Sequence, residues 1–74
     1  MKTDIFLRQV GASLRRRREA LGVSQEAFAD LIGMHRTYYG AIERGEKNLS
    51  LSTTIRVCAG LKAPVWEVFR EAEG

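Results

Sequence analysis

The chain has 74 residues, of which 28% are charged and 45% hydrophobic, and its formal net charge is +3. This length fits one small domain, residues 1–74, and a single cysteine, Cys58, allows neither an internal disulfide nor a cysteine-based metal site. No apolar run approaches the roughly 18 residues of a membrane span, and the segment around Asp4 lacks the apolar stretch of a secretory signal. We therefore expect a cytoplasmic protein with no membrane partner.

Basic residues are concentrated in two parts of the sequence. Four consecutive arginines occupy positions 15–18, and a looser group consists of Arg36, Arg44 and Lys47. The stretch 62–74 has instead two basic and three acidic residues, so the basic excess belongs to the preceding part of the chain. Contact with phosphates explains such an asymmetry, and a solvated helical face explains it equally well.

The apolar periodicity and the capping residues predict an all-α protein, a compact bundle of five short helices. The expected helices span residues 4–21, 25–32, 35–44, 51–61 and 64–72. Ser24 and Ser50 are placed to cap the second and fourth helices, and Thr3 or Asp4 to cap the first. Pro64 suits the first turn of the fifth helix, because a proline lacks the N–H group that would have no partner there.

Residues 25–44 have the spacing of a helix-turn-helix, in which the second helix enters the major groove of DNA. Ala29 is small where the two helices should cross, and Gly33 relieves the turn between them. Five apolar residues are expected to face the core: Phe28, Ile32, Met34, Tyr39 and Ile42. This arrangement leaves the first turn of the second helix free to contact base edges.

The stretch "LRRRREALGVSQEAFADLIGMHRTYYGAIERG" resembles the phage-repressor and Cro type of helix-turn-helix domain, and the likeness extends over residues 10–69. Within that family, "HRTYYGAIERGEKNLSL" is most similar to the controller proteins of restriction–modification systems. The resemblance implies a lambda-repressor-like fold and a transcriptional regulator, activator or repressor, that binds a palindromic double-stranded DNA operator as a homodimer.

The resemblance also implies roles for individual residues. Arg36 and Thr37 begin the recognition helix and are expected to contact bases, Arg36 through a bidentate contact to guanine. The residues expected to contact the DNA backbone are Gln25, His35, Tyr38, Arg44, Lys47 and Asn48. Each also has an ordinary structural explanation, such as a helix start for Gln25, a helix cap for His35 or a turn for Asn48.

Arg18 and Glu43 are expected, again from the family, to form a partly buried ion pair that fixes the recognition helix. Two residues depart from the family pattern: Tyr39 replaces the usual Ile or Val, and Gly40 lies inside the helix at a cost of about 1 kcal/mol relative to alanine. Gly40 either lets the backbone lie close to DNA or makes room for the Tyr39 ring.

One recognition helix reads only a few base pairs, so two half-sites and a dimer are expected. Segment 62–74 is the expected dimerisation helix. The candidate interface residues are Leu51, Ile55, Val65, Trp66, Val68 and Phe69. The alternative is that all of these residues close the core of the monomer.

Other classes of protein fit the sequence less well. With one histidine, one cysteine and no paired carboxylates, the chain is not expected to be an enzyme or to bind a metal, a cofactor or a small-molecule ligand. The basic charge would suit RNA, but the sequence lacks the aromatic platform on which RNA bases stack, so RNA binding fits less well. An antitoxin or adaptor that acts mainly through a partner protein remains the alternative, and salt-dependent binding to duplex DNA would discriminate against it.

Overall fold

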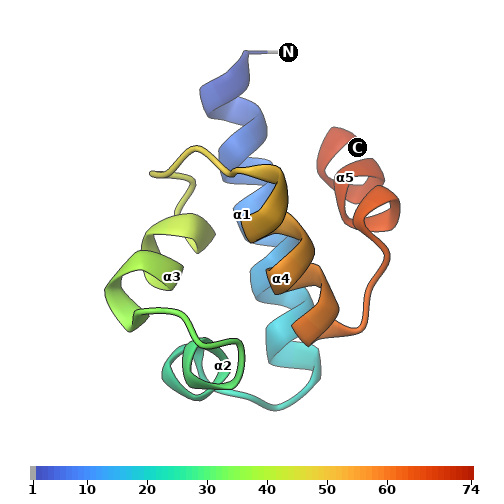
Figure 1. The fold of residues 1–74 in the computed structure, drawn as a ribbon. Coiled ribbons are helices and arrows are strands. Elements are labelled where there is room, and N and C mark those ends of the chain that lie inside the picture. The colour runs from blue at the N-terminus through green and yellow to red at the C-terminus, as the bar shows by residue number, and fades with distance from the viewer. Residues whose placement is uncertain (1) are drawn as a thin grey trace.

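The computed structural model describes residues 2–74, which form five α-helices. Their bounds are Thr3–Ala20 for α1, Gln25–Leu31 for α2, Arg36–Glu43 for α3, Leu51–Leu61 for α4 and Val65–Glu73 for α5. α1 and α4 lie in the middle of the molecule, with α2 and α3 on one side and α5 on the other (Figure 1). The predicted all-α class is confirmed for the described part of the chain.

Local side-chain caps explain where three of the helices begin. The Ser24 hydroxyl accepts a hydrogen bond from the backbone N–H of Ala27, and the Ser50 hydroxyl accepts one from Thr53. His35 caps α3 through its Nδ1 atom, which accepts from the Thr37 N–H. These contacts satisfy N–H groups that have no partner within the first turn of a helix.

The predictions for the first and last helices were wrong at their N-termini. α1 begins at Thr3 after Lys2, and neither Thr3 nor Asp4 caps it through its side chain. Pro64 has an extended backbone (ψ 141°) and lies just outside α5 as its N-cap residue, so its missing N–H lies before the first turn and not within it.

The core lies where the helices converge. Its largest fully buried side chains are Tyr39, Phe28, Ile42, Val10, Val57 and Val68. Phe28 of α2 and Tyr39 of α3 pack with ring centroids 5.1 Å apart. Of the five residues predicted to face the core, Ile32 and Met34 are only partly buried and pack against its edge.

A close approach of α1 to α3 depends on Gly11. A Cβ atom at this position would collide with the carbonyl group of Glu43 and would lie 2.7 Å from the carbonyl oxygen of Ile42. The end of α3 is therefore packed directly on the α1 backbone. This contact sets the position of α3 relative to the body of the domain.

α5 is attached to α1 on the opposite side by polar and aromatic contacts. The Arg17 guanidinium forms ion pairs with Glu67 (2.9 Å) and Glu71 (2.8 Å), and the buried Ser13 hydroxyl donates to Glu71. Phe6 and Phe69 meet edge to face, with centroids 5.6 Å apart. These contacts dock α5 on the side of α1 that faces away from α3 (Figure 1).

Candidate nucleic-acid interface

α2 and α3 form a helix-turn-helix whose turn is fixed by backbone contacts. Gly33 has a positive φ of 68°, and the next N–H group, that of Met34, donates to the Ala29 carbonyl at 2.9 Å. Ala29 is fully buried, as expected for the small residue at the helix crossing. The turn directs the first residues of α3 away from the core, and His35, Arg36 and Thr37 are all exposed.

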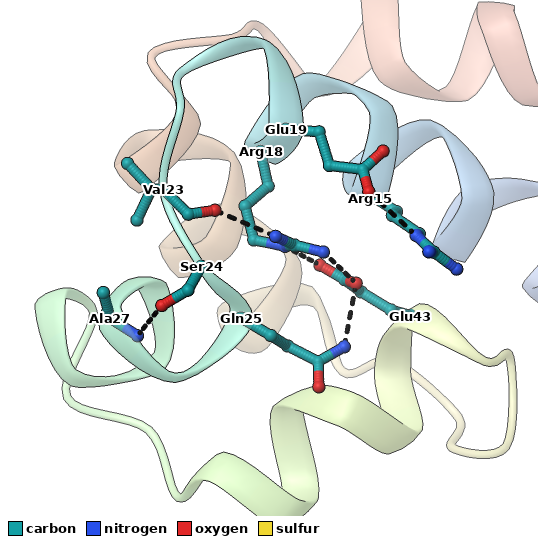
Figure 2. Close-up of polar contacts among 8 residues, drawn as sticks. All are labelled: Arg15, Arg18, Glu19, Val23, Ser24, Gln25, Ala27 and Glu43. Carbon is teal, nitrogen blue, oxygen red and sulfur yellow. Dashed lines mark hydrogen bonds and ion pairs between the residues drawn. The ribbon is translucent and has the colours of Figure 1, made fainter.

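The predicted ion pair between Arg18 and Glu43 is present and joins α1 to the end of α3. Arg18 Nε lies 2.7 Å from Glu43 Oε2, and Nη2 lies 3.1 Å from Oε1. The two side chains are only 9% and 2% exposed. Arg18 also donates through Nη1 to the Val23 carbonyl at 2.8 Å, so one guanidinium connects α1, α3 and the segment that leads into α2 (Figure 2).

Gln25 joins this network from the first position of α2. Its amide Nε2 donates to Glu43 Oε1 at 3.0 Å, and Figure 2 shows the amide approaching the carboxylate from the side opposite Arg18. The side chain expected to contact a DNA phosphate is thus half-buried and held by Glu43. Contact with DNA by this residue stays a prediction.

Gly40 provides the space that the Gln25 side chain occupies. A Cβ atom at Gly40 would lie 3.1 Å from Gln25 Oε1 and 3.2 Å from Arg44 Nη1. The absent side chain of Gly40 lets the Gln25 amide lie over α3. The suggestion that Gly40 makes room for the Tyr39 ring stays a prediction.

The charge of Glu43 is maintained in spite of its burial. Burial alone would raise the pKa of this carboxyl group, but hydrogen bonds, first of all from Arg18, outweigh that effect and hold the pKa below its usual value. Burial and the neighbouring Glu43 carboxylate raise the pKa of Tyr39. The Tyr39 hydroxyl makes no hydrogen bond with any described residue. At neutral pH the centre of the domain therefore contains a charged pair beside a neutral phenol.

Arg36 is exposed but not free. Its guanidinium lies 3.0 Å from Asp30 Oδ2 through Nη2 and 3.3 Å from Glu26 Oε2 through Nη1. A longer contact of 3.5 Å joins its Nε to Asp30 Oδ1. The hydrogen bond to Asp30 raises the pKa of Arg36. Sequence reasoning missed these two acids as partners of the arginine, although their i, i+4 spacing places them on one face of α2.

Of the other residues expected at the DNA backbone, His35 and Tyr38 lie at the start of α3, and Arg44, Lys47 and Asn48 lie at its end and in the loop after it. Lys47 Nζ lies over the Tyr38 ring at 6.0 Å from its centroid, the outer limit of a cation–π contact. Arg44 forms an exposed ion pair with Glu46, 3.1 Å long. Asn48 is exposed in the loop before α4. Arg44, Lys47 and Asn48 follow the last residue of α3, whereas Tyr38 directly follows Thr37 within the helix.

The candidate dimer residues divide into two groups. Leu51, Ile55 and Trp66 are 73%, 53% and 63% exposed. Val65 and Phe69 are partly buried against the core. Val68 is fully buried, so its assignment to the interface was wrong. It faces inward because α5 packs against both α1 and α4, and this position of the helix faces them.

Within the described residues, no helix combines the length and apolarity that crossing a bilayer requires. The described residues also contain no group of three or more histidine, cysteine or acidic side chains that could hold a metal ion.

Comparison with known proteins places this architecture in a family. A model of the helix-turn-helix domain matches residues 9–69, and the chain belongs to this helix-turn-helix family. The control protein C.MunI of a Mycoplasma species is 39% identical over 70 residues, which cover 95% of each chain. The resemblance to restriction–modification controllers seen in the sequence is therefore confirmed.

Two solved controller structures share the fold. The restriction–modification controller protein C.AhdI from Aeromonas hydrophila is 39% identical, with a TM-score of 0.80 over 84% of this chain and 94% of that chain. The C.Esp1396I controller, a tetramer in complex with its natural 35-base-pair operator, is 26% identical, with a TM-score of 0.81 over 93% of this chain and 96% of that chain.

We expect Glu43→Ala to lower the free energy of unfolding by about 3–5 kcal/mol, because it leaves the Arg18 guanidinium buried without its carboxylate. Urea unfolding followed by circular dichroism measures this loss. Glu19→Ala is the matched control, because it breaks an ion pair at the surface. Its partner Arg15 is 64% exposed, and Figure 2 shows this pair beside the buried one. The control should change stability by less than about 1 kcal/mol. Equal losses in the two variants would contradict a special role for the buried pair.

Acid should destabilise the protein through Glu43. Because folding lowers the pKa of this group from 4.5, its contribution to stability is complete above that pH and is lost as the pH falls through the folded pKa. Urea unfolding at pH 7, 5, 4 and 3 should therefore show a steeper loss for the wild type than for Glu43→Gln. Parallel curves for the two proteins would show that Glu43 does not contribute to acid sensitivity.

Proposed function

We propose that the protein is a sequence-specific transcriptional regulator that binds a palindromic double-stranded DNA operator as a dimer, and that it serves as the controller of a restriction–modification system. One observation carries the proposal. The first turn of α3 presents Arg36 and Thr37 to solvent, while the other end of that helix is fixed to α1 by the buried Arg18–Glu43 pair. Family membership and the operator complex of C.Esp1396I support this use of the helix.

In this proposal α3 lies in the major groove, and two kinds of contact are combined. Arg36 and Thr37 contact base edges, and a bidentate arginine–guanine pair discriminates by about 1–3 kcal/mol. Phosphate contacts fix the register of the protein on DNA. The proposed phosphate-contacting residues are Gln25, His35, Tyr38, Arg44, Lys47 and Asn48. Gln25 can act in this way while its amide also contacts Glu43, since an amide nitrogen has two hydrogens.

The dimer is proposed to form through α4 and α5. Leu51, Ile55 and Trp66 expose large apolar side chains on these two adjacent helices. An apolar groove beside Leu51, lined also by Phe6, Leu49 and Phe69, extends this surface. A continuous exposed apolar patch of this kind is more often an interaction site than ordinary surface is. In the view of Figure 1, α5 is separated from α3 by α1 and α4, so such an interface leaves the recognition helices free.

The proposal describes a DNA-binding protein of the cytoplasm and not an enzyme. The support for this is that the relatives are control proteins. A protein that acts mainly by holding a protein partner, such as an antitoxin or adaptor, is the competing possibility. The exposed apolar residues of α4 and α5 suit a protein partner as well as a second copy, so binding to DNA is the property that separates the two.

Arg36→Ala should abolish selective binding to the duplex immediately upstream of the gene, because the arginine–guanine contact is lost. A gel-shift titration at several salt concentrations, beside a scrambled duplex of equal length, measures the effect. Arg16→Ala removes the same charge from an exposed position on α1 and should retain selectivity. If the wild type binds both duplexes equally, the regulator proposal fails and a partner protein should be sought by pull-down.

Ile55→Lys should convert the dimer to a monomer, because two like charges would be buried across the two-fold axis. Sedimentation equilibrium measures the oligomeric state. Leu21→Lys adds the same charge at another exposed leucine, outside α4 and α5, and should leave the dimer intact. A dimer that survives Ile55→Lys and Trp66→Lys, each with native circular dichroism, would place the interface elsewhere.

A further inference from the structure

We propose that Glu26 and Asp30 are specificity-determining residues, which hold the Arg36 guanidinium so that it reads a base and does not serve as a phosphate anchor. This inference rests on the proposed function and deepens it. Its basis is the cluster in which Asp30 contacts Nη2 at 3.0 Å and Glu26 contacts Nη1 at 3.3 Å. Both acids project from α2 toward the first residue of α3, so the turn between the helices places them there.

The hydrogen bonds of Arg36 leave a bidentate donor pair available. A guanidinium has five N–H donors, one on Nε and two on each terminal nitrogen. Asp30 uses donors on Nε and Nη2, and Glu26 uses one on Nη1. One hydrogen therefore remains on each terminal nitrogen. These two hydrogens match the O6 and N7 acceptors of guanine when they are the parallel pair at the end of the guanidinium opposite Nε, which requires Glu26 to take the Nη1 hydrogen on the Cδ side.

The charges of the cluster favour a base over a phosphate. One guanidinium and two carboxylates carry a formal net charge of −1, so the group repels the DNA backbone although it contains an arginine. A phosphate that accepted the two remaining hydrogens would place a third negative charge beside the Glu26 and Asp30 carboxylates. Guanine O6 and N7 are uncharged, so a guanine can accept the two remaining hydrogens while both ion pairs persist.

The same contacts prepare the side chain for binding. Arginine is flexible, and ordering it on binding reduces affinity. Arg36, Glu26 and Asp30 are all exposed, so their individual ion pairs contribute little to stability. Their consequence for DNA binding is the orientation of the guanidinium at the start of the recognition helix. The guanidinium therefore has this orientation before the protein binds DNA.

Nonspecific binding depends on contacts with phosphates. The slope of its affinity against salt concentration reports how many phosphates are contacted. With both acids neutralised, Arg36 becomes free to pair with a phosphate of any sequence. Binding to nonspecific DNA should then strengthen more than binding to the operator. The ratio of the two affinities is therefore the quantity that responds to Glu26 and Asp30.

The experiment uses the double variant Glu26→Gln/Asp30→Asn of the full chain. Dissociation constants are measured for the upstream duplex and for the scrambled duplex between low and moderate salt. We expect the ratio of the two affinities to fall about tenfold, within the range of one bidentate contact. The salt slope on the scrambled duplex should steepen by about 0.9, the value for one added phosphate contact.

Two controls separate this effect from a general change of charge. Glu19→Gln removes an exposed acid that also pairs with an arginine, Arg15, and should strengthen both affinities in parallel. In an Arg36→Ala background, neutralising Glu26 and Asp30 should leave the salt slope on the scrambled duplex unchanged, because the residue that would gain the phosphate contact is gone. A merely structural role would not depend on Arg36.

An unchanged affinity ratio in the double variant would overturn the inference. So would a higher ratio, which would mean that the acids compete with the operator for Arg36. Either result would leave the regulator proposal intact, provided that the wild type selects the upstream duplex. If the wild type makes no selection between the two duplexes, the regulator proposal itself fails.

Discussion

The position of the recognition helix depends on one buried ion pair. Arg18 and Glu43 are nearly inaccessible to water, and each needs the other to offset the loss of hydration. Because Arg18 also holds the Val23 carbonyl and Glu43 also accepts from Gln25, the pair fixes α3 relative to both α1 and α2. The tight contact at Gly11 adds a steric limit to the same junction. The end of α3 is therefore anchored, while its first turn stays in solvent.

The two sides of α1 use polar residues differently. Toward α3, the Arg18 pair is buried and determines the geometry. Toward α5, Arg17 pairs with Glu67 and Glu71 at a partly exposed surface, where water also competes for the charges. Packing of Val68 and Phe69 supplies the apolar part of that junction. The run of arginines at 15–18 is thus not a uniform basic patch, because three of its members, Arg15, Arg17 and Arg18, pair with different acidic residues.

The candidate DNA surface shows why local charge is a poor guide to phosphate binding. Arg36 is the residue expected to contact bases, yet two carboxylates on α2 surround it. Arg44 likewise pairs with Glu46, while Lys47 lies over an aromatic ring. A basic side chain attracts DNA only with the part of its positive charge that neighbouring acidic groups do not neutralise. The sequence lists the charges, but it does not say which of them are paired.

The sequence by itself determined the five helices, the Ser24, His35 and Ser50 caps, and the helix-turn-helix, because these depend on residues only a few positions apart. It also indicated the Arg18–Glu43 pair, but only through likeness to a family, since no local rule connects residues 25 positions apart. Only the tertiary structure decided that Val68 is core, that Gly40 makes space for Gln25 and that Arg36 is held by Glu26 and Asp30. These outcomes depend on how the helices cross, and the crossing is set by the packing of the whole core.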